Sequence, residues 1–91
     1  MFHVLIPEYR QPVDVIEQTR PAHLEWVQGE VDAGRIILGG RQDPPKGGLF
    51  VTADISVEAA EDIIERDPYQ IAGLVSYRRI SFNGAFRAPE L

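Results

Sequence analysis

Cysteine is absent from this chain of 91 residues. Disulfide bridges, thiolate nucleophiles and cysteine-ligated metal sites are therefore excluded. No apolar run approaches the roughly 20 residues of a membrane-spanning helix. The first residues also lack the basic start and long apolar segment of a signal peptide. We therefore predict a soluble, cytoplasmic protein with no membrane partner.

Positive charge is scarce. Lys46 is the only lysine, and the chain carries a net charge of −5. Binding to nucleic acid requires clustered lysine and arginine to neutralise phosphates. The arginines are scattered here, apart from Arg78 and Arg79, which we interpret as a solvated strand end. The charge distribution predicts no nucleic-acid partner.

Histidine is rare too, and His3 and His23 are the only two. They do not form the HxH or HxxxH spacing typical of metal sites. Two glycine pairs, at 39–40 and 47–48, are not followed by the Lys-Ser/Thr of a phosphate-binding loop. We interpret them as turns and a strand bulge. The expectation is a protein with neither a metal nor a cofactor.

The length allows one domain, which we place at residues 1–91 with a core at 2–82 and a tail at 83–91. Runs of strand-forming residues predict strands near 2–6, 35–38, 49–53 and 74–82, the first of them ending near Pro7. Helices are expected from about 20 to 33 and from 57 to 66, with a short helical turn after Pro12. The order strand, helix, strand, strand, helix, strand predicts an α+β, ferredoxin-like βαββαβ fold with a four-stranded antiparallel sheet.

Local signals define the helix ends. Thr19 is a candidate cap for the first helix, and Gly34 is its expected stop. Ser56 is the expected cap of the second helix. Pro68 forces the preceding residue, Asp67, out of helical geometry and closes that helix.

The strands suggest assembly with a second copy. Phe2, Val4 and Ile6 lie on one face of the first strand, while Leu5 lies on the other. Neither face is polar, as a solvated face of a sheet is expected to be. Two helices cover only one face of a four-stranded sheet, so we predict a twofold homodimer that buries the other. The alternative is a monomer with a few exposed apolar side chains.

Two polar residues coincide with apolar helix faces. At about 100° per residue, Leu24, Val27 and Val31 form an apolar stripe with His23 at its rim. Asp67 falls within the apolar arc of the second helix. A buried carboxylate needs a cation or hydrogen-bond donors. If the two meet, Asp67 would hold one imidazole nitrogen and leave the other to move a proton.

Simpler interpretations of these residues stay open. His23 is then a packing residue, and Asp67 is a helix-end residue satisfied by backbone N–H groups. Arg20 and Arg41 can each clamp a carboxylate or phenolate, or form surface ion pairs. Gly40 allows a ligand to approach the backbone closely, and Tyr69 is an aromatic near the candidate site or simply a core residue.

Several short motifs together resemble the YciI-like (YCII-related) family, in order and spacing over about residues 2 to 82. They are Arg20-Pro21-Ala22-His23-Leu24, Gly34-Arg35, Gly39-Gly40-Arg41, Asp67-Pro68-Tyr69 and Ala72-Gly73-Leu74. The resemblance implies a dimeric α+β barrel of ferredoxin-like subunits, akin to muconolactone isomerase. It also implies a pocket with a His–Asp pair, which maps onto His23 and Asp67.

The resemblance also suggests a chemistry. A related dehydrochlorinase acts on a chlorinated hydroxyhydroquinone, which implies acid–base chemistry on a ring substrate. This sequence departs from the family at Arg41, where many relatives carry proline, and the departure alters the charge of the pocket.

We therefore expect a small lyase, isomerase or dehydrochlorinase-like enzyme acting on a cyclic oxygenated small molecule. His23 shuttles a proton, Asp67 orients it, and Arg20 or Arg41 neutralises a substrate anion. Gly40 and Tyr69 complete the expected substrate contacts. The alternative is a non-catalytic small-anion-binding or accessory module.

Overall fold

The computed structural model describes all residues from 1 to 91. Its elements are β1 (Phe2–Tyr9), α1 (Val13–Glu17), α2 (Arg20–Asp32), β2 (Ile36–Arg41), β3 (Gly48–Thr52), α3 (Val57–Arg66), α4 (Pro68–Ile71) and β4 (Val75–Phe82). The four strands form one antiparallel sheet in the order β2-β3-β1-β4. This order confirms the predicted α+β, ferredoxin-like βαββαβ fold.

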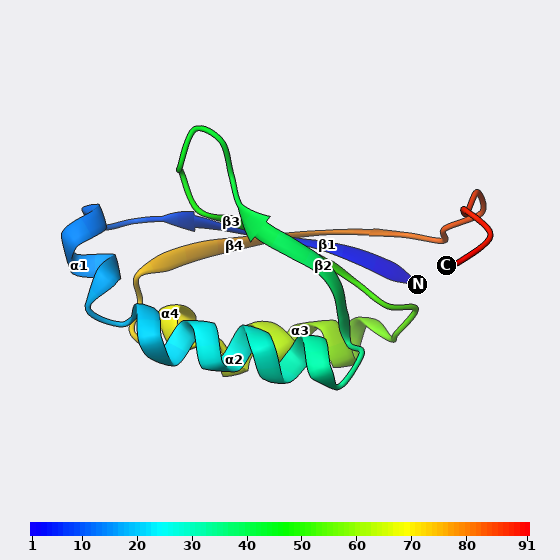
Figure 1. Ribbon diagram of the computed structural model, residues 1–91, viewed down its shortest axis with the longest axis horizontal. Coiled ribbons are helices and arrows are strands. Elements are labelled where there is room, and N and C mark those ends of the chain that lie inside the picture. Colours follow the sequence, from blue (N-terminus) through cyan, green and yellow to red (C-terminus); the bar gives the residue numbers. More distant parts are fainter.

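The helices lie on one side of the sheet. Figure 1 shows α2, α3 and α4 in a layer beneath the strands, while the loop between β2 and β3 rises on the opposite side. Helix α1 lies at one end of the sheet, and both chain termini lie near the other end. The molecule therefore has one covered face and one open face.

Two buried clusters hold the layers together. The larger joins the sheet to α3 and consists of Leu5, Ile36, Phe50, Ala60, Ile63 and Ile64. The smaller consists of Ile16, Tyr69, Leu74 and Val75, and it packs α1 and α4 against the start of β4. Each fully buried aliphatic side chain contributes about 1.5–3 kcal/mol. The second cluster therefore fixes α1 at the end of the sheet.

Strand β1 is longer than the sequence indicated, because it continues past Pro7 to Tyr9. Tyr9 donates its backbone N–H to Lys46 O, on the side of the β2–β3 loop. The nitrogen of Pro7, two residues earlier, points the same way, so its missing N–H removes no bond to β4. The extension places Tyr9 beside the helix layer.

Helix α2 ends as predicted, with Gly34 in a left-handed conformation at φ 76°. The predicted apolar stripe is wrong, because Leu24 is 46% exposed and Val31 is 41% exposed. The side chains that α2 buries most deeply are His23 and Glu30. Each has a charged partner at the end of α3, Asp67 for His23 and Arg66 for Glu30, so this helix face is buried although it is polar.

The cap predicted at Thr19 is only partly present. Its side chain makes no capping hydrogen bond, and its backbone carbonyl accepts from His23 N instead. At α3 the prediction is confirmed, because Ser56 Oγ accepts from Ala59 N at 3.0 Å.

Strand β2 runs through the glycine pair, which was expected to form a bulge. The irregularity in pairing lies earlier, between Ile36 and Leu38, and Gly39 and Gly40 pair regularly with Phe50 and Leu49. A Cβ atom at Gly39 would collide with the Phe50 ring. Glycine is therefore needed at position 39 because an aromatic ring packs against the backbone.

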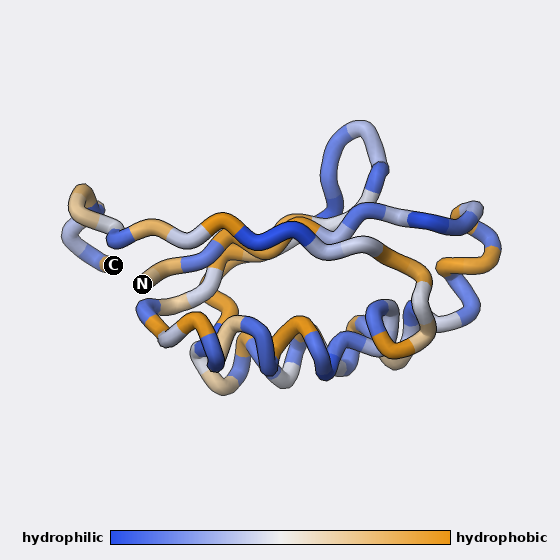
Figure 2. The backbone as a smooth tube through the Cα atoms, turned by 180° about the vertical axis from the view of Figure 1, so that it is seen from behind, coloured by the Kyte–Doolittle hydropathy of each residue, from blue (hydrophilic) through white to orange (hydrophobic).

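The open face of the sheet carries several exposed apolar side chains. Its exposed side chains include Leu38, Ile80 and Phe82, at 69%, 49% and 42% exposure. Seen from behind in Figure 2, hydrophobic stretches recur along the sheet, and no helix lies on that side. None of the helices combines the length and apolar character needed to cross a membrane.

Candidate functional site

His23 and Asp67 meet, which the sequence left open. His23 Nδ1 lies 2.8 Å from Asp67 Oδ1, and the two side chains are 11% and 0% exposed. Helix α2 carries the imidazole, and the carboxylate lies at the junction of α3 and α4. Asp67 has left helical geometry there, at φ −66° and ψ 120°, because Pro68 follows it.

The Asp67 carboxylate accepts three hydrogen bonds. Besides the imidazole, Oδ1 accepts from Tyr69 N at 2.9 Å, which caps the short helix α4. Oδ2 accepts from the Tyr77 hydroxyl at 2.5 Å. Burial, and then the adjacent Asp67 charge, raise the pKa of Tyr77 far above its ordinary value. Tyr77 therefore keeps its proton and acts as a permanent donor to Asp67.

This arrangement assigns the protonation of the ring nitrogens of His23. A carboxylate only accepts hydrogen bonds, so Nδ1 carries a hydrogen toward Asp67. No hydrogen bond within the chain engages Nε2. In the neutral ring Nε2 is consequently an acceptor, and it is the nitrogen left for a ligand.

Aromatic rings hold the imidazole in place. The His23 and Tyr69 rings stack with centroids 3.8 Å apart and planes 6° apart, and Trp26 lies 5.4 Å away. Burial first, and then the nearby Tyr9 and Glu17, raise the pKa of Tyr69 to about 12. Tyr69 is therefore an uncharged stacking partner over the physiological pH range.

A cavity of about 250 Å³ lies between the sheet and α2. Five of the six residues predicted for the site line it, namely Arg20, His23, Gly40, Arg41 and Tyr69. Asp67 lies behind His23 and does not reach the cavity wall. Apolar side chains supply much of the remaining lining, including Pro7, Leu24, Val27 and Phe50. The cavity thus combines an apolar wall with one imidazole and two cations.

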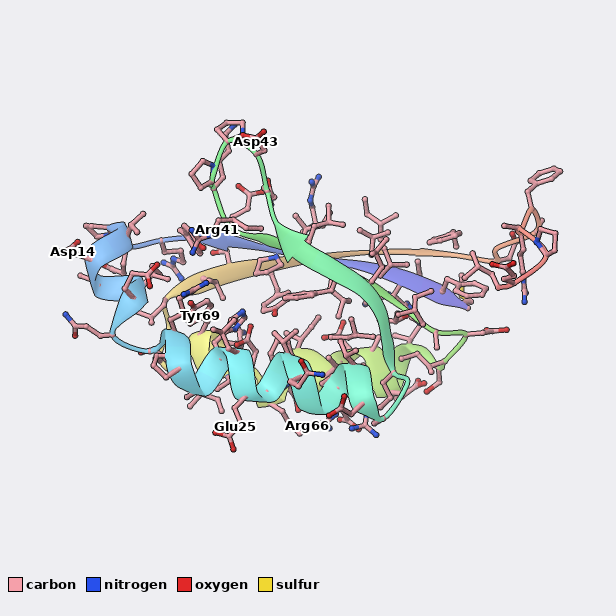
Figure 3. The ribbon with its side chains drawn as sticks, in the orientation of Figure 1. Asp14, Glu25, Arg41, Asp43, Arg66 and Tyr69 are labelled. Carbon is pink, nitrogen blue, oxygen red and sulfur yellow. The ribbon has the colours of Figure 1, made fainter.

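The two arginines share a single acidic partner, Glu17. Arg41 Nη2 lies 3.3 Å from Glu17 Oε1, and Arg20 Nε lies 3.8 Å from Oε2. The Tyr9 phenol foremost, and Glu17 after it, raise the pKa of Arg41 above its ordinary value. Figure 3 shows Arg41 on the sheet side and Tyr69 on the helix side at the same end of the molecule. The ion pairs expected for the arginines are present, both residues also line the cavity, and their role as a clamp for a ligand stays a prediction.

The sequence interpretation missed Tyr77, Tyr9 and Glu17. Tyr77 lies on the same face of β4 as Val75 and Arg79, and this period of two was the signal that Tyr77 faces the helices. Tyr9 was missed because the strand was expected to end at Pro7. Glu17 lies in a helical turn of five residues that offers too short a pattern to give its direction.

The second histidine belongs to a separate part of the core. His3 is fully buried, and its ring nitrogens contact Ser81 Oγ at 2.7 Å and Ile55 O at 2.9 Å. No group of three or more histidine, aspartate or glutamate side chains is arranged to hold a metal ion. Both ring nitrogens of His3 are satisfied, so its role is structural.

The four-stranded antiparallel sheet with helices on one face places this protein in the ferredoxin-like α+β class. The model of the YCII-related domain matches residues 1–82, and the chain belongs to this family. The resemblance found in the sequence is thereby confirmed.

The fold is similar to that of 5-chloro-2-hydroxyhydroquinone dehydrochlorinase (TftG) from Burkholderia phenoliruptrix AC1100, in its complex with 2,5-dihydroxybenzoquinone. The TM-score is 0.75 at 20% sequence identity, with 91% of this chain and 94% of that chain covered. At this identity the similarity concerns the fold. A comparison with curated protein sequences found no match.

Proposed function

We propose that this protein is a small acid–base enzyme of the lyase, isomerase or dehydrochlorinase-like kind, acting on a cyclic oxygenated molecule. One observation carries the proposal. The buried Asp67 carboxylate binds Nδ1 of His23, while the ring lines a cavity and Nε2 has no partner in the chain. The proposed catalytic residues are His23 and Asp67.

The geometry suits proton transfer. Neutral His23 takes a proton from the substrate at Nε2, and the Asp67 charge stabilises the imidazolium that forms. The electron pair released moves into the ring of the substrate. A leaving group such as chloride then departs with its bonding pair, or His23 returns the proton to another atom. A positioned base of this kind contributes roughly 10²–10⁴-fold in rate.

The cavity matches one substituted ring. An apolar cavity of about 150 Å³ holds benzene, and this one measures about 250 Å³. Arg20 and Arg41 neutralise an anionic oxygen of the ring, and Gly40 allows close approach of the substrate. The relative of similar fold acts on a hydroxyhydroquinone, which supports the same class of substrate here.

A matched pair of variants tests the proposal. Wild type is assayed on a panel of chlorinated and unchlorinated hydroxyhydroquinones by absorbance and by chloride release. His23→Ala is expected to lower turnover by roughly 10²-fold or more. Glu25→Gln is the control, because Glu25 is on the same helix and points into solvent (Figure 3). Unchanged turnover in a folded His23→Ala variant would end the catalytic claim.

The arginine pair favours a second candidate, a non-catalytic module that binds small anions. Two guanidinium groups at a cavity mouth retain an anion without any chemistry. Calorimetric titration with 2,5-dihydroxybenzoquinone at several pH values separates the two candidates. Binding followed by full recovery of every panel compound supports the module, and consumption of any of them supports the enzyme.

We also propose that the protein is a homodimer joined through the open sheet face. Exposed Leu38, Ile80 and Phe82 form an apolar surface of the kind that marks interfaces. Sedimentation should show a dimer for wild type and a monomer for Ile80→Asp. If wild type stays monomeric over a roughly 100-fold range of protein concentration, the homodimer proposal is wrong.

A cofactor-free reaction and a cytoplasmic location stay predictions from the sequence.

A further inference from the structure

The mouth of the cavity has more positive than negative charge. Arg20 and Arg41 line the cavity, and no aspartate or glutamate does. Glu17 uses both of its carboxylate oxygens, one for each arginine. Two cations therefore share one anion in a protein whose net charge is −5.

The contacts that Glu17 makes are weak ones. At 3.3 and 3.8 Å they are longer than a charge-assisted hydrogen bond of good geometry. All three side chains are between 41% and 45% exposed. Exposed ion pairs of this kind contribute little to stability because water and salt screen them. Replacing Glu17 by another anion therefore costs little free energy.

An anion on the cavity side meets a different environment. The cavity lining there includes apolar side chains such as Leu24 and Phe50. A ring that packs against these side chains displaces water from beside its own anionic oxygens, and this strengthens their attraction to Arg20 and Arg41. A ligand that carries paired anionic oxygens thus has an advantage over the Glu17 carboxylate.

We infer that Glu17 is an internal competitor for the anion site, and that the site selects ring compounds with a carboxylate or a vinylogous carboxylate. When such a compound enters, its paired oxygens take the place of Glu17 between Arg20 and Arg41. Glu17 is a specificity-determining residue, because neutral rings gain nothing by displacing it. This inference rests on the proposed ligand class, and it does not require that catalysis occurs.

The position of Glu17 follows from α1, whose Ile16 is buried against Tyr69, Leu74 and Val75. The competitor therefore projects from a fixed turn of helix and is not part of a loose loop.

The test measures the dissociation constants of two probes by calorimetry at low salt. The anionic probe is 2,5-dihydroxybenzoquinone, and the neutral probe is 1,4-hydroquinone. Glu17→Gln is expected to tighten binding of the anion by about three- to tenfold and to leave the neutral probe unchanged. Arg41→Gln should weaken the anion by roughly tenfold.

The matched control is Asp14→Asn, which makes the same change of charge on the same helix. Asp14 is exposed, forms no ion pair and points away from the body of the protein (Figure 3). If Glu17→Gln and Asp14→Asn change the dissociation constant of the anion equally, only the net charge of the protein matters and the inference is wrong. Weaker anion binding in Glu17→Gln also overturns it, because Glu17 would then merely orient the arginines. Failure of wild type and Glu17→Gln alike to bind the anion overturns it too.

His23→Ala separates this inference from the catalytic proposal. The variant keeps both arginines and Glu17, so it should still prefer the anionic probe. Loss of turnover with retained anion preference supports both proposals. Retained turnover in His23→Ala removes the catalytic proposal and leaves the inference about Glu17 standing.

Discussion

Helix α2 buries one titratable side chain toward each of its ends, and the two differ in how completely they are satisfied. Near the start, His23 has one nitrogen bonded to Asp67 and one free toward a cavity. Near the end, Glu30 is 3% exposed and binds Arg35 Nε at 2.5 Å and Arg66 Nη2 at 2.9 Å. A buried polar group with every partner supplied is structural, whereas one that lacks a partner beside a cavity is a candidate for chemistry.

At the other end, Glu30 and its partners Arg35 and Arg66 form a buried ion-pair cluster, here called the Glu30 clamp. Burial opposes ionisation of Glu30, but the hydrogen bonds and charges of Arg35 and Arg66 outweigh it and lower its pKa. The shallow hollow beside it is lined by Arg35, Ala59, Asp62 and Arg66. Both of its cations already bind the buried Glu30 carboxylate, and the Asp62 carboxylate also lines the hollow, so no excess positive charge is left for a ligand. The clamp joins α2 to the start of β2 and to the end of α3.

Both ends depend on two consecutive residues where α3 ends. Arg66 is its last residue and binds Glu30, while Asp67 follows it and binds His23. The two targets are seven residues apart on α2, which is about 10 Å along the helix axis. Neighbouring residues reach both because Asp67 leaves helical geometry before Pro68.

The largest expected effect is that of Asp67→Asn. An amide can donate to Nδ1 and then forces the wrong tautomer, so we expect turnover to fall by roughly 10²–10⁴-fold. The fold should persist, since asparagine also caps α4. The hydrogen-bonded Nδ1–H resonance of His23 in proton NMR should disappear. Normal turnover in Asp67→Asn would erase the distinction between the two ends of α2.

Tyr77→Phe comes next, because it leaves Asp67 Oδ2 buried without its donor. We expect a loss of about 1.5–3 kcal/mol in the free energy of unfolding near neutral pH. The pKa of Tyr77 is raised in the folded state, so its contribution is present below the unfolded pKa of about 10 and is lost as the pH rises above it.

Urea denaturation at neutral and alkaline pH measures this difference. Tyr9→Phe is the control, since no hydrogen bond joins the Tyr9 hydroxyl to a carboxylate. Wild type should lose unfolding free energy as the pH rises above about 10, and Tyr77→Phe should lose less. If both lose the same amount, the Tyr77 phenol is not the group that titrates.

The smallest effect is expected for Glu30→Gln, whose arginine partners are 45% and 48% exposed and stay solvated. We expect a loss of about 1–2 kcal/mol in unfolding free energy, with unchanged turnover per folded molecule. The pKa of Glu30 is lowered in the folded state, so its contribution is present above the ordinary value of 4.5 and is lost as the pH falls.

The stability difference between wild type and Glu30→Gln should therefore shrink as the solution is acidified below about 4.5. Thermal unfolding from pH 3 to pH 7 tests it. A fall in turnover without a change in stability would show that Glu30 serves the site and not the fold.

The order of the elements followed from strand-forming runs and helix signals, and the candidate site residues followed from polar residues on apolar helix faces and from the family resemblance. The inward face of α2 did not follow. Hydrophobic periodicity placed Leu24 and Val31 inward, because it assumes that a buried helix face is apolar. The partner that makes Glu30 an inward residue is Arg66, 36 positions further along the chain. Such a pairing leaves no periodic signal in either segment.

The sequence by itself determined where the backbone turns. Gly34 ends α2, Ser56 begins α3 and Pro68 expels Asp67 from its helix, because sterics and capping act between neighbouring residues. Only the tertiary structure decided which nitrogen of His23 is held and which is free. That choice depends on the register between α2 and the α3–α4 junction, which is set by side-chain packing between segments distant in the chain.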